Sequence, residues 1–409
     1  MKKNVIIILV LVPLINWAQD SLTMNDAITV TLANNKRMQA ATQQVLQHER
    51  LRRTTTELPK TEVSFMYGQY NSIVKDNNIT LMQTIPFPTA FASKRGYLNA
   101  QLEVSKSQKT LTENELTFQV KALCIQAYYL YGKKSLLIQQ DSIFRTLRDA
   151  ITKKFMTGEE TKLELTKAQA RLSEIQNLAH QTNADIKIIE SSIQALLNSP
   201  NPAFIKNSSN IMLSIPNFDS VDAEVNPVVQ VFKYQSEAAA KLKSLERART
   251  LPDFKIGYFN QTLTGFQKIN GQDQYFGKDK RFTGLQAGIS IPLWFFPQAA
   301  QVKSLDYASK KAEAEFQQSK IDWWAQLQKY YQQAMKNKSS LEYYLNSGLP
   351  LAKLIQQQAL KSYKQGEISI TEMLPAVNQA IGIQESYLNT LMEYNHSIIN
   401  IEFLIGQKS

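Results

Sequence analysis

Cysteine is almost absent from this 409-residue sequence, where Cys124 is the single example. One cysteine cannot form an intramolecular disulfide, and Cys124 lies in a helical pattern, so we expect it to pack as a small apolar residue. The three histidines, His48, His180 and His396, are far apart and show no metal-ligand spacing. Phosphate-binding loops, nucleophile elbows and metalloprotease motifs are also missing. We therefore expect no catalysis, no cofactor and no bound metal.

Long apolar runs are equally scarce. The longest lies within Val5–Ile15, which is too short to cross a bilayer as a helix. Lys2 and Lys3 precede this run and the small residue Ala18 follows it, so residues 1–18 are predicted to be a signal peptide, with a short membrane anchor as the alternative. If the remaining chain enters a membrane, it must do so with strands.

Charge of one sign does not cluster along the chain. The formal net charge is +11, but the Lys and Arg residues are spread among Glu, Asp and Gln in helical patterns. Such a pattern is typical of solvated helix faces. Without a basic patch interleaved with aromatic residues, the sequence predicts no nucleic-acid partner.

Only 14 glycines and 13 prolines interrupt the chain, so its segments must be long. Residues 299–363 read as one helix of roughly 100 Å at 1.5 Å per residue. Its apolar residues recur in steps of three, four and seven, as in a coiled-coil seam. They are Leu305, Ala312, Phe316, Trp323, Leu327, Tyr330, Ala334, Leu341, Leu345, Ala352, Ile355 and Ala359.

The same order of segments occurs twice. Each half is predicted to contain a helix, two strands, a long helix, a glycine turn and a returning helix. The first half has helices at 26–57, 90–155 and 162–197 and strands at 61–70 and 79–85. The second has helices at 228–249 and 299–363, a returning helix that ends at Leu404, and strands at 254–262 and 284–291, separated by a longer polar loop. Matching landmarks, such as Ile85-Pro86 with Ile291-Pro292, indicate an internal duplication. We therefore divide the chain into a first repeat at 19–200, a linker at 201–227 and a second repeat at 228–409.

The four predicted strands each carry one apolar face and are near the length that crosses a bilayer when tilted. Four strands cannot close, and an open edge in lipid leaves backbone groups unsatisfied. The chain is therefore predicted to oligomerise. Two copies would supply eight strands and three copies twelve, and closure alone does not choose between them.

The repeated order, together with Phe155–Glu159, Tyr363–Ser369 and the Ile-Pro after each second strand, resembles the TolC-type outer-membrane efflux proteins. The resemblance implies a mainly α fold with a small β part. In that fold a homotrimer forms a twelve-stranded outer-membrane β-barrel that continues into a periplasmic α-barrel tunnel. It also implies that the turns at Gly158-Glu159 and Gly366-Glu367 dock a periplasmic adaptor (membrane fusion) protein and an inner-membrane pump of the resistance-nodulation-division type.

A narrower resemblance concerns the substrate. The segments Gly257–Gln261, Arg281-Phe282 and Gly288–Leu293 resemble the heavy-metal-cation branch of these channels. The implied function is a passive duct through outer-membrane lipid, carrying heavy-metal cations or drugs from the pump to the outside. An export duct for proteins is one alternative, and a periplasmic coiled-coil scaffold is another.

Two glutamates are candidates for a tunnel constriction. Glu164 and Glu372 each lie six residues after a turn glycine, and the resemblance implies that acidic residues here line the narrow end of the tunnel. Glutamate in a first helical turn also favours the helix dipole, which is the simpler interpretation. Glu159, Glu160 and Glu367 are alternatives that we expect to face solvent at the turns.

Pro350 lies inside the predicted long helix of the second repeat, after Gly348. Proline removes one backbone donor and clashes with the preceding turn, so a kink is expected there. The kink would either bend the tip inward or be a neutral bend. The first repeat has no proline at the matching position, so the two hairpins should differ near their tips.

Overall fold

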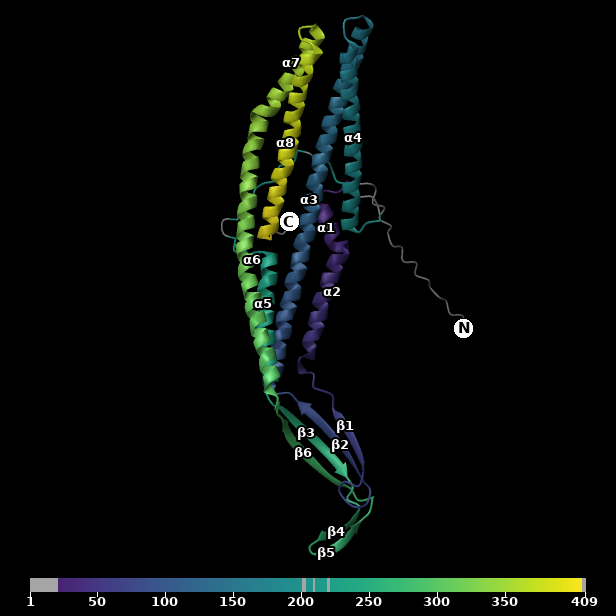
Figure 1. The fold of residues 1–409 in the computed structure, drawn as a ribbon, viewed down its shortest axis with the longest axis vertical. Helices are drawn as coiled ribbons and strands as arrows, with labels where there is room; N and C mark the ends of the chain where they lie inside the picture. Colours follow the sequence, from purple (N-terminus) through teal and green to yellow (C-terminus); the bar gives the residue numbers. More distant parts are fainter. Residues whose placement is uncertain (1–20, 201–203, 209, 219–220, 407–409) are drawn as a thin grey trace, which may run out of the picture. The chain divides into compact units, whose positions relative to one another are not determined.

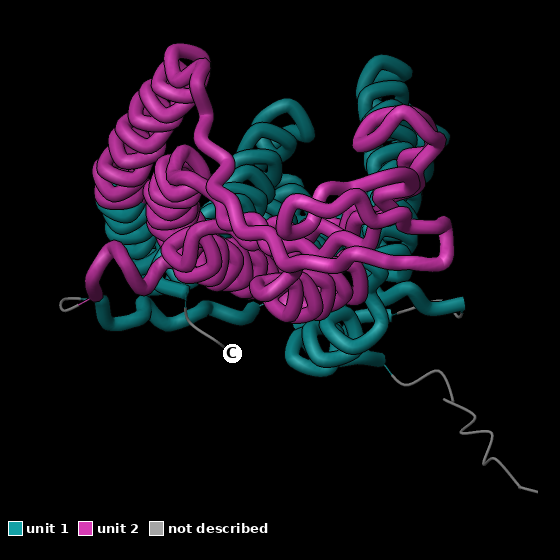
Figure 2. Tube along the Cα trace, turned by 90° about the horizontal axis from the view of Figure 1, so that it is seen from below, with its two compact units in different colours: residues 1–36, 114–218, 327–409 teal, residues 37–113, 219–326 magenta. Residues whose placement is uncertain are grey.

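The computed structural model describes residues 21–200, 204–208, 210–218 and 221–406, and the predicted signal peptide lies outside them. The chain is mainly α with a small β part, as predicted. It forms two compact units (Figure 2). Unit 1 comprises residues 1–36, 114–218 and 327–409, and unit 2 comprises residues 37–113 and 219–326. Each unit combines segments of both predicted repeats.

The helices are as long as the scarcity of glycine and proline predicts (Figure 1). They are α1 (Met24–Asn34), α2 (Lys36–Leu51), the 3₁₀ turn η1 (Arg52–Thr56), α3 (Pro88–Met156), α4 (Lys162–Leu197), the 3₁₀ turn η2 (Ala223–Val225), α5 (Pro227–Arg249), α6 (Phe295–Tyr343), the π-helical turn η3 (Tyr344–Gly348), α7 (Leu349–Gln365) and α8 (Ile370–Ile405).

The core of unit 1 joins two antiparallel helical hairpins. The end of α3 and α4 form one hairpin, and α7 and α8 form the other. Phe144 of α3, Ile175 of α4, Tyr363 of α7 and Met373 of α8 all belong to one buried cluster. Complete burial of such a side chain contributes about 1.5–3 kcal/mol relative to exposure. Cys124 is buried in a second cluster, as expected for a small apolar residue.

The predicted helix at 26–57 is wrong in one respect, because the structure breaks it at Asn35. Asn35 has extended backbone angles, φ −66° and ψ 132°, and separates α1 from α2. Its side-chain Nδ2 donates to the carbonyl oxygen of Leu196 at 2.9 Å. The break exchanges intrahelical hydrogen bonds for a contact with α4, which local periodicity could not reveal.

All four predicted strands are present in unit 2 and pair in one antiparallel sheet of order β1-β2-β3-β6. Their bounds are β1 (Glu62–Gly68), β2 (Asp76–Ile85), β3 (Asp253–Gln261) and β6 (Phe282–Ser290). Pairing of β2 with β3 joins the two predicted strand pairs. The register places Val63, Leu81, Tyr258 and Leu285 in one row across the sheet. Directly paired residues share a face, so this row belongs to one apolar face, and all four side chains are exposed.

The polar loop predicted between the last two strands contains a second, two-stranded sheet, formed by β4 (Gly265–Ile269) and β5 (Gln272–Phe276). Asn270 and Gly271 turn the hairpin with φ 52° and 84°, which suits a type I′ turn. Phe266 and Tyr275 pair directly across it, with ring centroids 5.3 Å apart. The Asn-Gly pair was the local signal for this hairpin.

Asp76, at the start of β2, accepts hydrogen bonds from the two loops at this end of the sheet. Its carboxylate accepts hydrogen bonds from the backbone N–H of Thr264 at 2.8 Å, the hydroxyl of Thr262 at 3.1 Å and the hydroxyl of Ser72 at 2.8 Å. The residue is fully buried. One side chain therefore ties the loop before β2 to the segment between β3 and β4.

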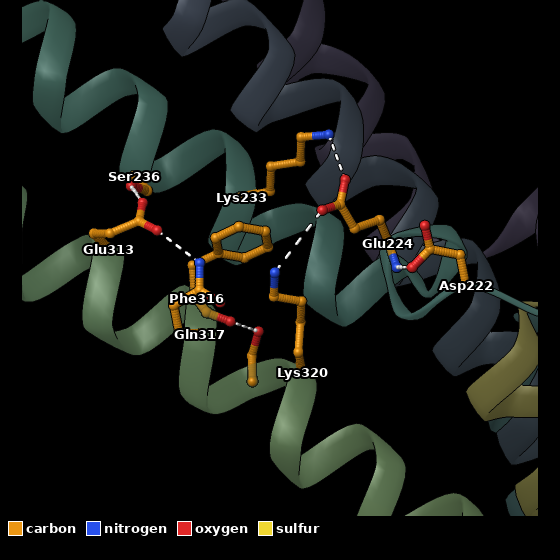
Figure 3. A network of polar contacts seen from close by, with 9 residues as sticks. Asp222, Glu224, Lys233, Ser236, Glu313, Phe316, Gln317 and Lys320 are labelled. Atoms are coloured by element: carbon orange, nitrogen blue, oxygen red, sulfur yellow. Dashed lines mark hydrogen bonds and ion pairs between the residues drawn. The ribbon is translucent and has the colours of Figure 1, made fainter.

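Ion pairs and hydrogen bonds hold α5 against α6 and η2 in unit 2 (Figure 3). Glu224 contacts Lys233 at 2.7 Å and Lys320 at 4.0 Å. Glu313 accepts from the hydroxyl of Ser236 at 2.9 Å and from the side-chain amide of Gln317 at 2.7 Å. Partly exposed pairs of this kind add little stability singly, so they mainly set the register of the helices.

No helix in the described ranges combines the length and the apolar character needed to cross a membrane.

We predict that Asp76→Ala loosens the β4–β5 hairpin. The substitution leaves the buried N–H of Thr264 without its acceptor, which costs about 1–3 kcal/mol. Trypsin should then cleave faster after Lys268 and Lys278, as followed by mass spectrometry. Gln274→Ala, at an exposed position of β5 opposite Gln267, is the matched control and should cleave like the wild type. Equal cleavage rates in all three proteins would contradict the role of Asp76.

Candidate functional site at the helical hairpin turns

The two predicted tip turns have the same backbone conformation. Gly158 and Gly366 have φ 80° and 78°, in the left-handed region expected of them. The N–H of Glu159 donates to the carbonyl of Lys154, and the N–H of Glu367 donates to the carbonyl of Ser362, both at 2.9 Å. Each turn is therefore a Schellman motif that ends the incoming helix.

The glutamates after the two glycines are exposed and stabilise their own turns. Glu159 accepts a hydrogen bond from the hydroxyl of Thr157 at 3.0 Å, and Glu367 accepts one from the hydroxyl of Ser362 at 2.8 Å. Both carboxylates stay open to solvent, so they give each turn an acidic outer surface.

Glu164 and Glu372 occupy equivalent places in the two returning helices. Each occupies position N3 of a capping box, in which Thr161 or Ser369 is the N-cap. Oε2 of Glu164 accepts the backbone N–H of Thr161 at 3.1 Å, and Oε2 of Glu372 accepts the backbone N–H of Ser369 at 2.9 Å. Hydrogen bonds from the backbone and hydroxyl of Ser369 lower the pKa of Glu372. Across the described chain, no hydrogen bond or ion pair joins Glu164 to Glu372.

Glu160, which the sequence placed in solvent, instead links the two hairpins. Its Oε1 accepts a hydrogen bond from the hydroxyl of Tyr363 at 3.3 Å, and the ammonium of Lys154 lies 4.9 Å from the centre of the Tyr363 ring. A side-chain hydrogen bond with Glu164, together with burial and the charge of Glu164, raises the pKa of Glu160. The same hydrogen bond, followed by those from Thr161, lowers the pKa of Glu164. Of the two carboxyl groups, Glu160 is therefore the one that keeps its proton to higher pH.

Tyr363 keeps its own proton at neutral and acidic pH, because burial and the charge of Glu160 raise its pKa to about 12. Its hydroxyl therefore stays a donor to Glu160. Sequence reasoning missed this pair because Glu160 and Tyr363 are separated by 203 positions, and only the packing of the two hairpins brings them together.

Pro350 lies two residues after the end of a π-helical turn. In η3, the N–H of Leu349 donates to the carbonyl of Tyr344, one residue further back than in an α-helix. The ribbon changes direction between α6 and α7 (Figure 1), which agrees with the expected kink. A second proline, Pro375, lies inside α8 and was missed.

Within the described residues, no group of three or more His, Cys, Asp or Glu side chains could hold a metal ion.

We predict that the tip loses stability as pH rises above 4.5, the ordinary pKa of glutamate. A carboxyl whose pKa is raised in the folded state stabilises it fully below the unfolded pKa, and that contribution is lost as pH rises through the folded pKa. The lowered pKa of Glu164 acts in the opposite sense, below pH 4.5. Hydrogen exchange of residues 155–165, corrected for intrinsic rates, should therefore be faster at pH 7 than at pH 5.

Glu160→Gln should abolish this difference, because an amide still accepts from Tyr363 and donates to Glu164 but does not titrate. Glu367→Gln, at the exposed turn of the other hairpin, is the control and should keep the wild-type profile. A profile of Glu160→Gln that matches the wild type would rule out Glu160 as the group that titrates.

Neither a protein-family model nor a curated protein matches this sequence. Several solved structures do match its fold. The outer membrane protein VceC from Vibrio cholerae has a TM-score of 0.75 at 13% identity, with 94% of this chain and 96% of that chain covered. CusC, described for its transmembrane channel formation, has a TM-score of 0.77 at 13% identity, with 95% and 93% covered. The outer-membrane channel OprN has a TM-score of 0.80 at 14% identity, with 94% and 89% covered.

These similarities extend over nearly the whole chain and over nearly the whole length of each matched structure. The predicted resemblance is therefore confirmed at the level of the fold: this chain folds as the TolC-type outer-membrane efflux channels do.

Proposed function

We propose that the chain is a passive outer-membrane duct of a tripartite efflux system. The observation that carries the proposal is the exposed apolar face of the four-stranded sheet. Leu285 is 84% exposed and Val63 is 66% exposed, at opposite edges of one row. Apolar side chains in such a continuous row need lipid or protein to cover them. This uncovered face argues against a periplasmic coiled-coil scaffold.

The edges of the sheet support oligomerisation. Within the described chain, β1 pairs only with β2, and β6 pairs only with β3. In lipid each open edge would leave its N–H and C=O groups unsatisfied, so the edges of neighbouring copies pair instead. Three copies give a twelve-stranded barrel wide enough for a lumen, which we propose as the homotrimer. Residues 1–18 then direct the chain through the inner membrane.

The hairpin turns supply the docking surface. Two equivalent Schellman turns, at Gly158-Glu159 and Gly366-Glu367, present small residues and acidic side chains to solvent. We assign them to a periplasmic adaptor protein, with an inner-membrane pump of the resistance-nodulation-division type as the energy source. The exported substrates are heavy-metal cations or drugs, and an export duct for proteins is the alternative. The repeats at 19–200 and 228–409, with their linker at 201–227, are the two halves of each subunit's wall.

Glu164 and Glu372 are proposed to line the constriction of this tunnel, where a trimer would carry six such carboxylates. Each capping bond uses Oε2, so the box fixes the carboxylate at the start of the returning helix. The bend beside Pro350 is proposed to direct the second hairpin toward the tunnel axis.

The first test concerns the apolar face. Leu285→Lys places a charge on that face, which costs about 2–4 kcal/mol near the middle of a bilayer. We expect the variant to be reduced in the outer-membrane fraction and to lose heat-resistant trimers on unboiled gels. Gln286→Lys, one residue along β6 on the opposite face, should assemble normally. Normal assembly of both variants, or a detergent-free monomer of the wild type, would contradict the duct.

The second test concerns the constriction. Glutamine can occupy the same position of a capping box, so Glu164→Gln with Glu372→Gln removes charge while keeping both caps. In planar bilayers with a salt gradient, we expect the reversal potential to shift toward lower cation selectivity. Glu174→Gln, an exposed position on α4, is the control. Currents identical to the wild type would exclude both residues from the constriction.

A further inference from the structure

A cleft of about 560 Å³ lies in unit 2 where the sheet meets the helices. The end of α5, the residues after β6 and the first turns of α6 line it. Its floor is apolar and includes Ile291, Phe295 and Val302. Three cationic side chains, Lys243, Arg247 and Lys303, form its polar side. The volume falls within the range of small-molecule sites.

The charges in the cleft are unbalanced. Asp306 is its one carboxylate, and it is shared by three lysines: Lys243 at 2.7 Å, Lys310 at 3.0 Å and Lys303 at 3.7 Å. Hydrogen bonds from Lys243 and Lys310 hold the pKa of Asp306 below its usual range. Arg247 makes no ion pair with any described residue. The cleft therefore has cationic capacity left for an anion.

A second polar group in the cleft also lacks a partner. The side-chain oxygen Oε1 of Gln298 is buried and has no hydrogen-bond partner among the described residues. An unpaired buried acceptor costs free energy, which a ligand donor would recover once the Gln298 side chain turns its amide into the cleft. The occupant should therefore combine an anionic group with an N–H or O–H donor.

The surroundings of the cleft point to lipid. Leu293, Trp294 and Phe296 follow β6 directly and are 81%, 82% and 72% exposed. Aromatic residues gather at this depth in membrane proteins, where one end of the ring meets the acyl chains and the other meets the headgroups. In the proposed duct, on which this step rests, the junction of sheet and helices lies at the periplasmic leaflet of the outer membrane.

We propose that the cleft binds a glycerophospholipid with an ethanolamine headgroup. The phosphate contacts Arg247 and Lys303, the headgroup ammonium donates to Oε1 of Gln298, and an acyl chain covers the apolar floor. The ligand thereby fills the cationic capacity, the unpaired acceptor and the exposed apolar surface together. Bound lipid would seal each subunit at the boundary between barrel and tunnel.

The test uses native mass spectrometry of the full protein, purified in mild detergent and offered dioleoyl phosphatidylethanolamine or dioleoyl phosphatidylcholine. The two lipids share acyl chains and phosphate, but the choline group has no N–H to donate to Gln298. We expect the wild type to retain the ethanolamine lipid about fivefold better, the value of one net hydrogen bond. Gln298→Leu should remove this preference without removing lipid.

Arg247→Gln with Lys303→Gln should lose both lipids. Lys241→Gln with Lys311→Gln removes two cations from the same helices outside the cleft and should retain lipid like the wild type. Wild-type retention by the Arg247 and Lys303 variant, or equal retention of the two lipids by the wild type, would overturn the proposal. The proposal would also be overturned if the Arg247 and Lys303 variant lost its trimers but kept its lipid, because the cleft would then be a contact between copies.

The same preparations separate this inference from the proposed function. Heat-resistant trimers in the outer-membrane fraction that carry no bound lipid would contradict the cleft alone. Absence of wild-type trimers from that fraction would contradict the duct itself.

Discussion

The pairing of β2 with β3 is the interaction on which the sheet of this protein depends. These strands belong to different predicted repeats, and Asn78 and Gln261 at one end of the pairing are 183 positions apart. Without that pairing there would be two isolated hairpins, and an isolated hairpin is marginal in water. With it, one apolar row crosses all four strands and the outer edges of β1 and β6 stay open. The need to cover that row and close those edges is the physical reason for proposing that several copies assemble.

The hairpin turns show how one local motif can serve two purposes. Each capping box satisfies backbone donors at the start of a helix and at the same time orients a carboxylate there. At the first turn Glu160 adds a second carboxyl group, and at the second turn the equivalent residue is Ile368, which packs against the core cluster of unit 1. The two turns therefore share their backbone but differ in chemistry, and only the first has two carboxyl groups close together.

Much of the fold could be predicted because its signals are local. Helical spacing, strand alternation and proline ends placed α4 at residues 162–197 without error and β1, β2, β3 and β6 to within about three residues at each end. The left-handed glycines were recognisable for the same reason, since no other residue adopts that conformation so readily. The β4–β5 hairpin was missed because its strands are short and polar, and the break at Asn35 because its side chain bonds to a distant helix.

By itself, the sequence determined most of the helices, the four strands of the larger sheet and the glycine turns, and it predicted that this pattern occurs twice. Those properties depend on residues within one or two turns of each other. The tertiary structure decided which strands pair, how the compact units cut across the repeats, and that Glu160 meets Tyr363. It also decided that Gln298, Arg247 and Phe295 share one cleft. These contacts join residues far apart in the chain, and they form only when burial of apolar side chains offsets the entropy of ordering the segments between them.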